Sequence, residues 1–219
     1  MVKLVLTEDE TMLADSARGF LDKSAPVKAF RDLRDAGQTH DAKMWKEMAA
    51  MGWAGVLVPE SAGGVDMGHA AAGILAQEMG KTLAVSPFLS TAVIAATALR
   101  HVSDARAEAA LAKIASGDAT YALAVDETSK FNPDATAMTA TAEGNGFRLT
   151  GKKTFVVDGA LADRLLVLAK TDNGLTLFDI PADRAGITRN AQNMIDARDS
   201  ARIDFDTVSY THLTLPTKA

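Results

Sequence analysis

The first half of the chain carries apolar residues at the three- and four-residue spacing of amphipathic helices. Thr7 and Glu10 have the spacing of a capping box, in which each side chain binds the backbone amide of the other, and they predict a helix start. A second helix is predicted from Asp41, as its N-cap, to Gly52. Its buried face would carry Trp45, Met48 and Ala49. Further helices are predicted over residues 68–80, 87–101 and 103–117, the last with Ser103 as its N-cap.

After Asp118 the pattern changes to short runs that are typical of strands. The runs cover residues 121–125, 138–143, 147–150, 154–157, 165–170, 175–180 and 201–205. Gly144-Asn145-Gly146 and Asp172-Asn173-Gly174 separate alternating runs, and Asn-Gly pairs accept the positive φ angles of tight hairpins. The sequence therefore predicts an α+β multidomain protein. An all-α helical bundle at residues 1–118 would precede an antiparallel β-barrel-like domain at residues 119–208.

Composition narrows the classes of function. The 219 residues carry a net charge of −5 with scattered Lys and Arg, so no basic surface for nucleic acid or a membrane is expected. The absence of cysteine excludes disulfides and thiolate chemistry, and the four histidines lie too far apart for metal-ligand spacing, so we expect no metal site. The apolar N-terminal run ends before Glu8 and is too short for a signal or membrane segment. We therefore expect a cytoplasmic protein.

Several short motifs become specific when they are taken together. Pro59–Gly64 alone, with the sequence Pro-Glu-Ser-Ala-Gly-Gly, would be a connecting loop. Along the chain it follows the predicted helix of Trp45 and the pair Gly52-Trp53, and it precedes Glu78-Met79-Gly80. In the second half, residues 146–155 look like a hairpin with a Gly-x-Lys strand, and residues 162–171 look like the strand that follows it. In order, spacing and α-then-β layout, the chain resembles the acyl-CoA dehydrogenase family over about 200 residues.

The resemblance implies an oxidoreductase acting on CH–CH groups. Members of this family use FAD to oxidise an acyl-CoA thioester to the 2-enoyl-CoA, with the redox chemistry supplied by the flavin. The resemblance also implies electron-transfer flavoprotein as electron acceptor and a homo- or hetero-oligomer. The catalytic carboxylate belongs to a C-terminal helical part of the family. No catalytic base is therefore assigned to any residue of this chain.

The cofactor contacts are where this sequence departs from the family pattern. Counting back from Gly151, the family's Thr/Ser-Glu-Pro-x-x-Gly-Ser-Asp loop falls on Val125–Asn132. In the strand that follows, Lys153 is kept, whereas phenylalanine replaces tryptophan and valine replaces a hydroxyl residue. By resemblance, the cofactor-binding candidates are Leu123, Ala124, Val125, Phe155 and Val157, and the substrate-binding candidates are Lys130 and Phe131.

These departures leave two interpretations open. Backbone amides at residues 123–125 could still hold FAD, with Thr128 and Ser129 as substitute donors and Phe155 covering one face of the ring. Alternatively, the chain is a non-catalytic partner subunit of a hetero-oligomeric acyl-CoA dehydrogenase and has no flavin of its own. The adjacent carboxylates Asp126 and Glu127 would point to opposite faces of a strand, so we expect them to lie on a solvated loop.

The end of the chain departs from the family again. Residues 198–208 resemble the closing strand of the family's β-domain. Residues 209–219 fit neither a strand continuation nor a linker and look like a translated adapter, so we expect a non-native tail after Val208. On this interpretation the C-terminal catalytic part is missing. We expect the truncated chain to be inactive alone.

Overall fold

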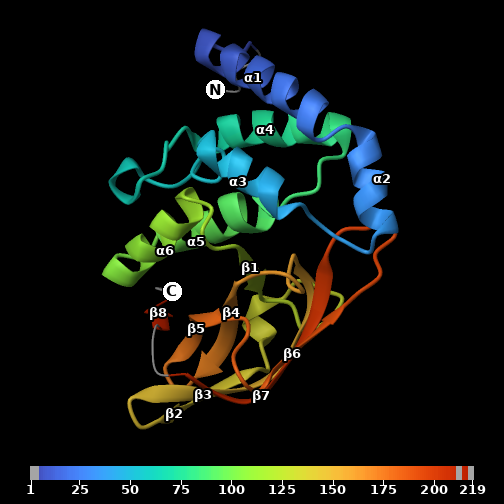
Figure 1. The fold of residues 1–219 in the computed structure, drawn as a ribbon. Coiled ribbons are helices and arrows are strands. Elements are labelled where there is room, and N and C mark those ends of the chain that lie inside the picture. Colours follow the sequence, from blue (N-terminus) through green and yellow to red (C-terminus); the bar gives the residue numbers. More distant parts are fainter. Residues whose placement is uncertain (1–4, 211–213, 217–219) are drawn as a thin grey trace. The chain divides into compact units, whose positions relative to one another are not determined.

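A computed structural model of the chain describes residues 5–210 and 214–216. The chain divides into two compact units, one that ends at Asp118 and one that continues from Ala119, with residues 101–110 grouped with the second. The first unit is helical and the second is built on a β-sheet, as the ribbon shows (Figure 1). The predicted α+β class is therefore confirmed.

The helical unit is made of short and medium helices joined by tight turns. The helices are α1 (Glu8–Ser24), α2 (Val27–Asp35), α3 (Ala42–Ala50), η1 (Glu60–Ala62), α4 (Gly68–Thr82), the π-helical η2 (Phe88–Ala95) and α5 (Ala96–Arg100). Helix α6 (Ala105–Ala115) shares its residues between the two units. No helix in the described part of the chain has the length and apolar composition that a membrane span requires.

Local capping chemistry explains where α1, α3 and α6 begin. The Thr7–Glu10 capping box forms as predicted, with both reciprocal hydrogen bonds present. Asp41 caps α3 as predicted, because its carboxylate accepts from the amides of the first turn. At α6 the predicted cap is wrong by one residue: Asp104, not Ser103, accepts the amide of Arg106. A carboxylate at this position also forms an ion pair with the Arg106 side chain, which Ser103 could not do.

The turn at residues 59–68 is closed mainly by backbone hydrogen bonds, and Arg100 contributes an ion pair with Asp66 and a hydrogen bond to the Leu57 carbonyl oxygen. The amides of Val65, Asp66 and Met67 donate to carbonyl oxygens of the apolar segment 55–58. Gly63 adopts a left-handed φ of 80° and ends η1. A Cβ on Gly64 would run into the carbonyl oxygen of Val58, so the two backbone segments approach closely only because glycine stands there.

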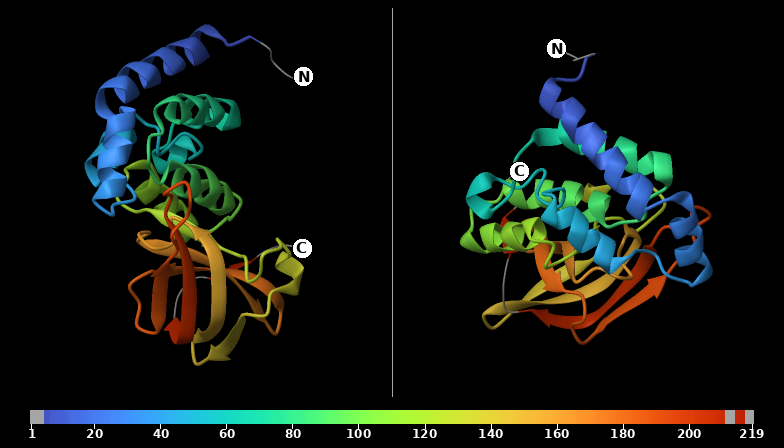
Figure 2. Two further views of the ribbon diagram at one scale, coloured as in Figure 1. Left: turned by 90° about the vertical axis from the view of Figure 1, so that its right-hand side faces the viewer. Right: turned by 45° about the horizontal axis from the view of Figure 1, so that its top comes forward.

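The second unit is an eight-stranded sheet in the order β6-β7-β3-β2-β4-β5-β8, with β1 paired to β4. Its strands are β1 (Tyr121–Ala124), β2 (Thr139–Glu143), β3 (Gly146–Val157), β4 (Arg164–Thr171), β5 (Gly174–Pro181), β6 (Ile187–Ala191), β7 (Ser200–Tyr210) and β8 (Thr214–Pro216). The strands curl around a shared apolar core (Figure 2). Both predicted hairpins are present, β2 with β3 and β4 with β5.

Three features of the sheet differ from the sequence-based expectation. The sheet is mixed rather than antiparallel, because β1 runs parallel to β4. The runs 147–150 and 154–157 form one long strand, β3, interrupted by a bulge. Strand β7 continues through Ser209 and Tyr210, and the backbone of residues 214–216 pairs with β5. The expectation that residues after Val208 fit no strand is therefore wrong for these positions, because their backbones find partners in the sheet.

Candidate cofactor site

The candidate cofactor residues come from two segments that the sheet unit brings together. The chain leaves β1 at Ala124, and the carbonyl oxygen of Asp126 then accepts a hydrogen bond of 2.8 Å from the amide of Thr154 in β3. The carbonyl oxygen of Val125 accepts a second bond, of 3.0 Å, from Lys153 Nζ. Residues 123–125 and 155–157 are therefore neighbours in space although about thirty residues separate them in the sequence.

A β-bulge shapes the strand at this point. Between Lys153 and Val156, two residues of β3 oppose one residue of β7. Phe155 lies in the bulge with a φ of 52°, in the left-handed region that bulky residues rarely occupy. The bulge buries both Lys153 and Thr154 and leaves the Phe155 side chain 46% exposed. Strained residues of this kind cluster at functional sites, and an exposed aromatic ring held this way is suited to stacking.

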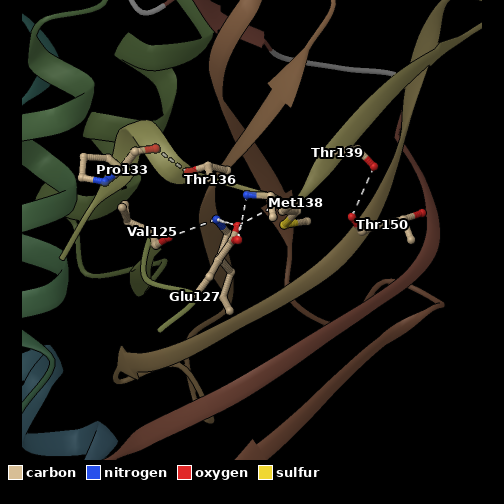
Figure 3. A network of polar contacts seen from close by, with 9 residues as sticks. Val125, Glu127, Pro133, Thr136, Met138, Thr139 and Thr150 are labelled. Carbon is tan, nitrogen blue, oxygen red and sulfur yellow. Dashed lines mark hydrogen bonds and ion pairs between the residues drawn. The ribbon is translucent and has the colours of Figure 1, made fainter. Parts of the chain in front are cut away.

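A loop follows β1 and returns to β2 through the 3-10 turn η3 (Pro133–Ala135), and Glu127 closes it. The Glu127 carboxylate accepts the amide of Ala137 at 2.8 Å and the amide of Met138 at 3.0 Å. It also forms an ion pair of 2.8 Å with Lys153 Nζ. Figure 3 shows the carboxylate directed at the far end of its own loop. We call the Glu127 and Lys153 side chains the clasp, together with these three contacts and the hydrogen bond from Lys153 to the Val125 carbonyl oxygen.

The protein environment shifts the pKa values of both clasp residues. Burial alone would raise the pKa of Glu127, but the hydrogen bond from Lys153 and those from the two amides outweigh burial and hold this pKa below its ordinary value. Burial lowers the pKa of Lys153, and the Glu127 and Asp126 carboxylates offset only part of that effect. The clasp therefore holds two opposite charges in a position where water contributes little.

The predicted site residues differ in what they can offer a ligand. Ala124 is fully buried in the sheet core, so only its backbone is available, whereas Leu123, Val125 and Val157 are half-buried. Lys130 and Phe131 lie on the exposed stretch of the loop, where Phe131 is 77% exposed and Lys130 makes no ion pair within the described residues. These two are therefore on the same loop as the clasp but outside its hydrogen-bond network.

Two expectations about this loop need revision. Glu127 does not lie on a solvated loop: it is 15% exposed, because Lys153 and two backbone amides satisfy its carboxylate inside the unit. Thr128 is already engaged, since its hydroxyl donates to the Lys130 carbonyl oxygen and accepts from the Lys130 amide. As a substitute donor for a cofactor, Thr128 would have to give up the first of these bonds.

The remaining groups of the site are compatible with a flavin. Asp126 Oδ1 is buried and has no hydrogen-bond partner in the described part of the chain, so the loop keeps an acceptor that a ligand N–H could satisfy. The isoalloxazine ring of FAD carries such an N–H and a large aromatic face, for which Phe155 offers an exposed ring. No cluster of three or more His, Asp or Glu side chains suited to a metal ion occurs among the described residues.

The helical unit identifies the family. A family model described as "Acyl-CoA dehydrogenase, N-terminal domain" matches residues 7–118. The chain belongs to the acyl-CoA dehydrogenase family. Acyl-CoA dehydrogenase FadE27 of Mycobacterium tuberculosis is 32% identical over 162 residues, which cover 74% of this chain and 42% of that protein. The chain spans about half the length of the curated acyl-CoA dehydrogenases it matches.

Solved structures confirm the acyl-CoA dehydrogenase fold across both units. A chain of the ChsE4-ChsE5 complex from M. tuberculosis has a TM-score of 0.85 at 26% identity, and the match covers 95% of this chain and 57% of that one. The glutaryl-CoA dehydrogenase of Mycobacterium smegmatis in complex with FADH2 has a TM-score of 0.82 at 22% identity, covering 96% and 56%. The resemblance deduced from Trp45, Pro59–Gly64 and the Gly-x-Lys strand is therefore confirmed.

Proposed function

We propose that this chain is part of an FAD-dependent acyl-CoA dehydrogenase that oxidises an acyl-CoA thioester to the 2-enoyl-CoA. The observation that carries the proposal is the meeting of residues 123–125 with the Phe155 bulge, which presents backbone groups and an exposed ring at one place. The glutaryl-CoA dehydrogenase of M. smegmatis, which has the same fold, has been solved in complex with FADH2. Bound FAD would supply the oxidant for the Cα–Cβ bond of the substrate.

Every candidate residue except Val157, whose side chain has no hydrogen-bonding group, has a defined task in this proposal. Phe155 would cover one face of the flavin ring, and the backbone at Leu123–Val125 would contact its polar edge. Lys130 and Phe131, exposed on the loop, would contact acyl-CoA, whose phosphates attract a cation and whose adenine can stack on a ring. The catalytic base would come from sequence outside this chain. The electron acceptor would be electron-transfer flavoprotein, and the complete protein would be a homo- or hetero-oligomer.

The domain limits follow the same reasoning and are part of the proposal. We propose an N-terminal helical domain at residues 1–118 and a middle β-domain at residues 119–208. The foreign origin of residues 209–219 is proposed on their sequence alone. Sequencing the gene across codon 208 tests it, because a native continuation should resemble the family's linker and C-terminal helices and should supply a glutamate for the base.

A titration of the full gene product with FAD, followed by flavin fluorescence, tests the cofactor. Phe155→Ala should weaken FAD binding about tenfold, since a stacked aromatic contributes about 0.5–1.5 kcal/mol beyond its area. Leu161→Ala is the matched control, because Leu161 is 47% exposed in the same unit and has no role in the proposal. Equal affinity for both variants would remove Phe155 from the site.

The same titration distinguishes the alternative function. A correctly folded full gene product that binds no FAD would contradict the proposal and would favour a non-catalytic partner subunit. Such a subunit should co-purify with a second dehydrogenase chain that carries flavin. The match to a chain of the two-component ChsE4-ChsE5 complex makes this co-purification experiment worth performing.

A further inference from the structure

The clasp engages both ends of the 125–138 loop. At the start of the loop, Lys153 Nζ donates to the Val125 carbonyl oxygen at 3.0 Å and to Glu127 Oε1 at 2.8 Å. At its end, the Glu127 carboxylate accepts the amides of Ala137 and Met138. One carboxylate and one ammonium therefore close a loop of more than ten residues and anchor it to β3.

Burial gives this ion pair a large desolvation cost. The Lys153 side chain is 0% exposed and that of Glu127 is 15% exposed, so both charges have lost most of their hydration. Apolar side chains of similar volume would stabilise a sheet core equally well, which makes stability alone a weak reason for an ion pair here. What apolar side chains could not do is bind the Val125 carbonyl and the two amides that define the loop.

The bonds of the clasp end on the segments that would contact a cofactor. Val125 is one of the proposed backbone contacts, and Lys153 lies two residues before Phe155, at the start of the bulge. Movement of either clasp residue would therefore shift the loop against the bulge. Because a stacked ring and backbone contacts both depend on position, such a shift would weaken the binding of FAD.

We propose that Lys153 and Glu127 are positioning residues that hold the 125–138 loop in the form that binds FAD, an inference that rests on the proposed function. The clasp acts through the loop and the bulge and needs no contact with the flavin. Loss of the clasp releases the Ala137 and Met138 amides and frees Val125 from β3. Arginine at position 153 keeps the charge and the donors and restores part of the function.

Two measurements on the full gene product test the inference. The first is hydrogen exchange of the Ala137 and Met138 amides without FAD, which should accelerate about tenfold in Lys153→Met because their acceptor is no longer anchored. The second is the dissociation constant for FAD, which should rise about tenfold in Lys153→Met, the loss expected when the Phe155 ring no longer stacks in place, and return towards wild type in Lys153→Arg. Lys152→Met is the control, because Lys152 is the exposed neighbour of Lys153 on the same strand.

The two measurements separate failure of the inference from failure of the proposed function. Wild-type protein that binds no FAD overturns the proposed function, and the inference with it, even if the exchange rates respond as expected. Wild-type protein that binds FAD, together with Lys153→Met or Glu127→Gln of unchanged affinity, overturns the inference alone. If Lys153→Met does not fold, Glu127→Gln decides: weaker FAD binding with faster exchange supports the clasp, and wild-type values for both refute it.

Discussion

The two units close their main loops by different means. In the helical unit, the turn at residues 59–68 is closed mainly by backbone hydrogen bonds to residues 55–58, and Arg100 adds an ion pair with Asp66 and a hydrogen bond to the Leu57 carbonyl oxygen. In the sheet unit, the loop at residues 125–138 is closed by the side chains of Glu127 and Lys153. The first closure depends mainly on the close approach of two backbone segments at Gly64, and the second depends on the charge of two residues. We therefore expect the first turn to respond most to side-chain size and the second to charge and pH.

The largest effect is expected from Gly64→Ala in the helical unit. A Cβ at this position would meet the carbonyl oxygen of Val58, so either the turn or segment 55–58 must move. We expect the free energy of unfolding to fall by more than about 3 kcal/mol. Gly63→Ala is the matched control, because Gly63 has a left-handed φ but open space around it, and it should cost about 1 kcal/mol. Urea unfolding measures both. Equal losses would mean that conformation, not close approach, fixes the turn.

Lys153→Met should destabilise the sheet unit by about 3 kcal/mol, because it leaves the Glu127 carboxylate poorly hydrated and without its counter-ion. The double variant Lys153→Met/Glu127→Gln should lose less than the sum of the single variants, since the unpaired charge is gone. The measurement is a double-mutant cycle in urea. Additive losses would show that the two side chains do not act together, and the comparison of the two loops would fail.

A pH series on Glu127→Gln sharpens the comparison. The pKa of Glu127 in the folded state lies below its ordinary value, so the clasp contributes full stability above that ordinary value and loses it as the pH falls through the folded pKa. Asp126 and Lys153 are the other charged groups near the carboxylate. The difference in unfolding free energy between wild type and Glu127→Gln should therefore be largest near pH 7 and shrink towards pH 3. A difference that stays constant with pH would contradict the clasp.

The smallest effect is expected for an exposed ion pair. Lys28 and Asp32 on α2 form a bond of 2.6 Å at helical spacing, with both side chains well exposed. Lys28→Met should change the unfolding free energy by less than about 0.5 kcal/mol, because water and salt screen such pairs. The difference between the losses in Lys153→Met and Lys28→Met then measures the effect of burying the ion pair. A loss at Lys28 as large as that at Lys153 would remove burial as the explanation.

Features defined by short sequence spacing could be predicted. The capping box at Thr7, the cap at Asp41 and both Asn-Gly hairpins depend on residues within a few positions of one another. Helix α2 was missed although Val27, Phe30 and Leu33 have helical spacing, because it is only nine residues long, most of them charged, and none is fully buried. Strand β6 was missed because none of its five residues is buried and only the first and the last, Ile187 and Ala191, are apolar.

The candidate site was predictable only in part. Phe155 and Lys153 could be chosen from the strand motif, but the left-handed φ of Phe155 follows from pairing of β3 with β7, whose partner residues lie about fifty positions away. The role of Glu127 depends on a lysine 26 residues later, a separation that no local pattern reports. A rule that adjacent carboxylates alternate along a strand failed because β1 ends at Ala124, before either of them.

The parallel pairing of β1 with β4 has a consequence for folding. Tyr121 pairs with Arg164, so β1 can pair only after a strand about forty residues later in the sequence has been made. The β2–β3 hairpin, by contrast, pairs residues that are close in the sequence. During synthesis the hairpin can therefore form while β1 still presents an unpaired edge. Strand β1 would therefore be synthesised before the β2–β3 hairpin but would pair after it. Residues 123–125, which end this strand at the candidate site, would be among the last of the sheet to take their final positions.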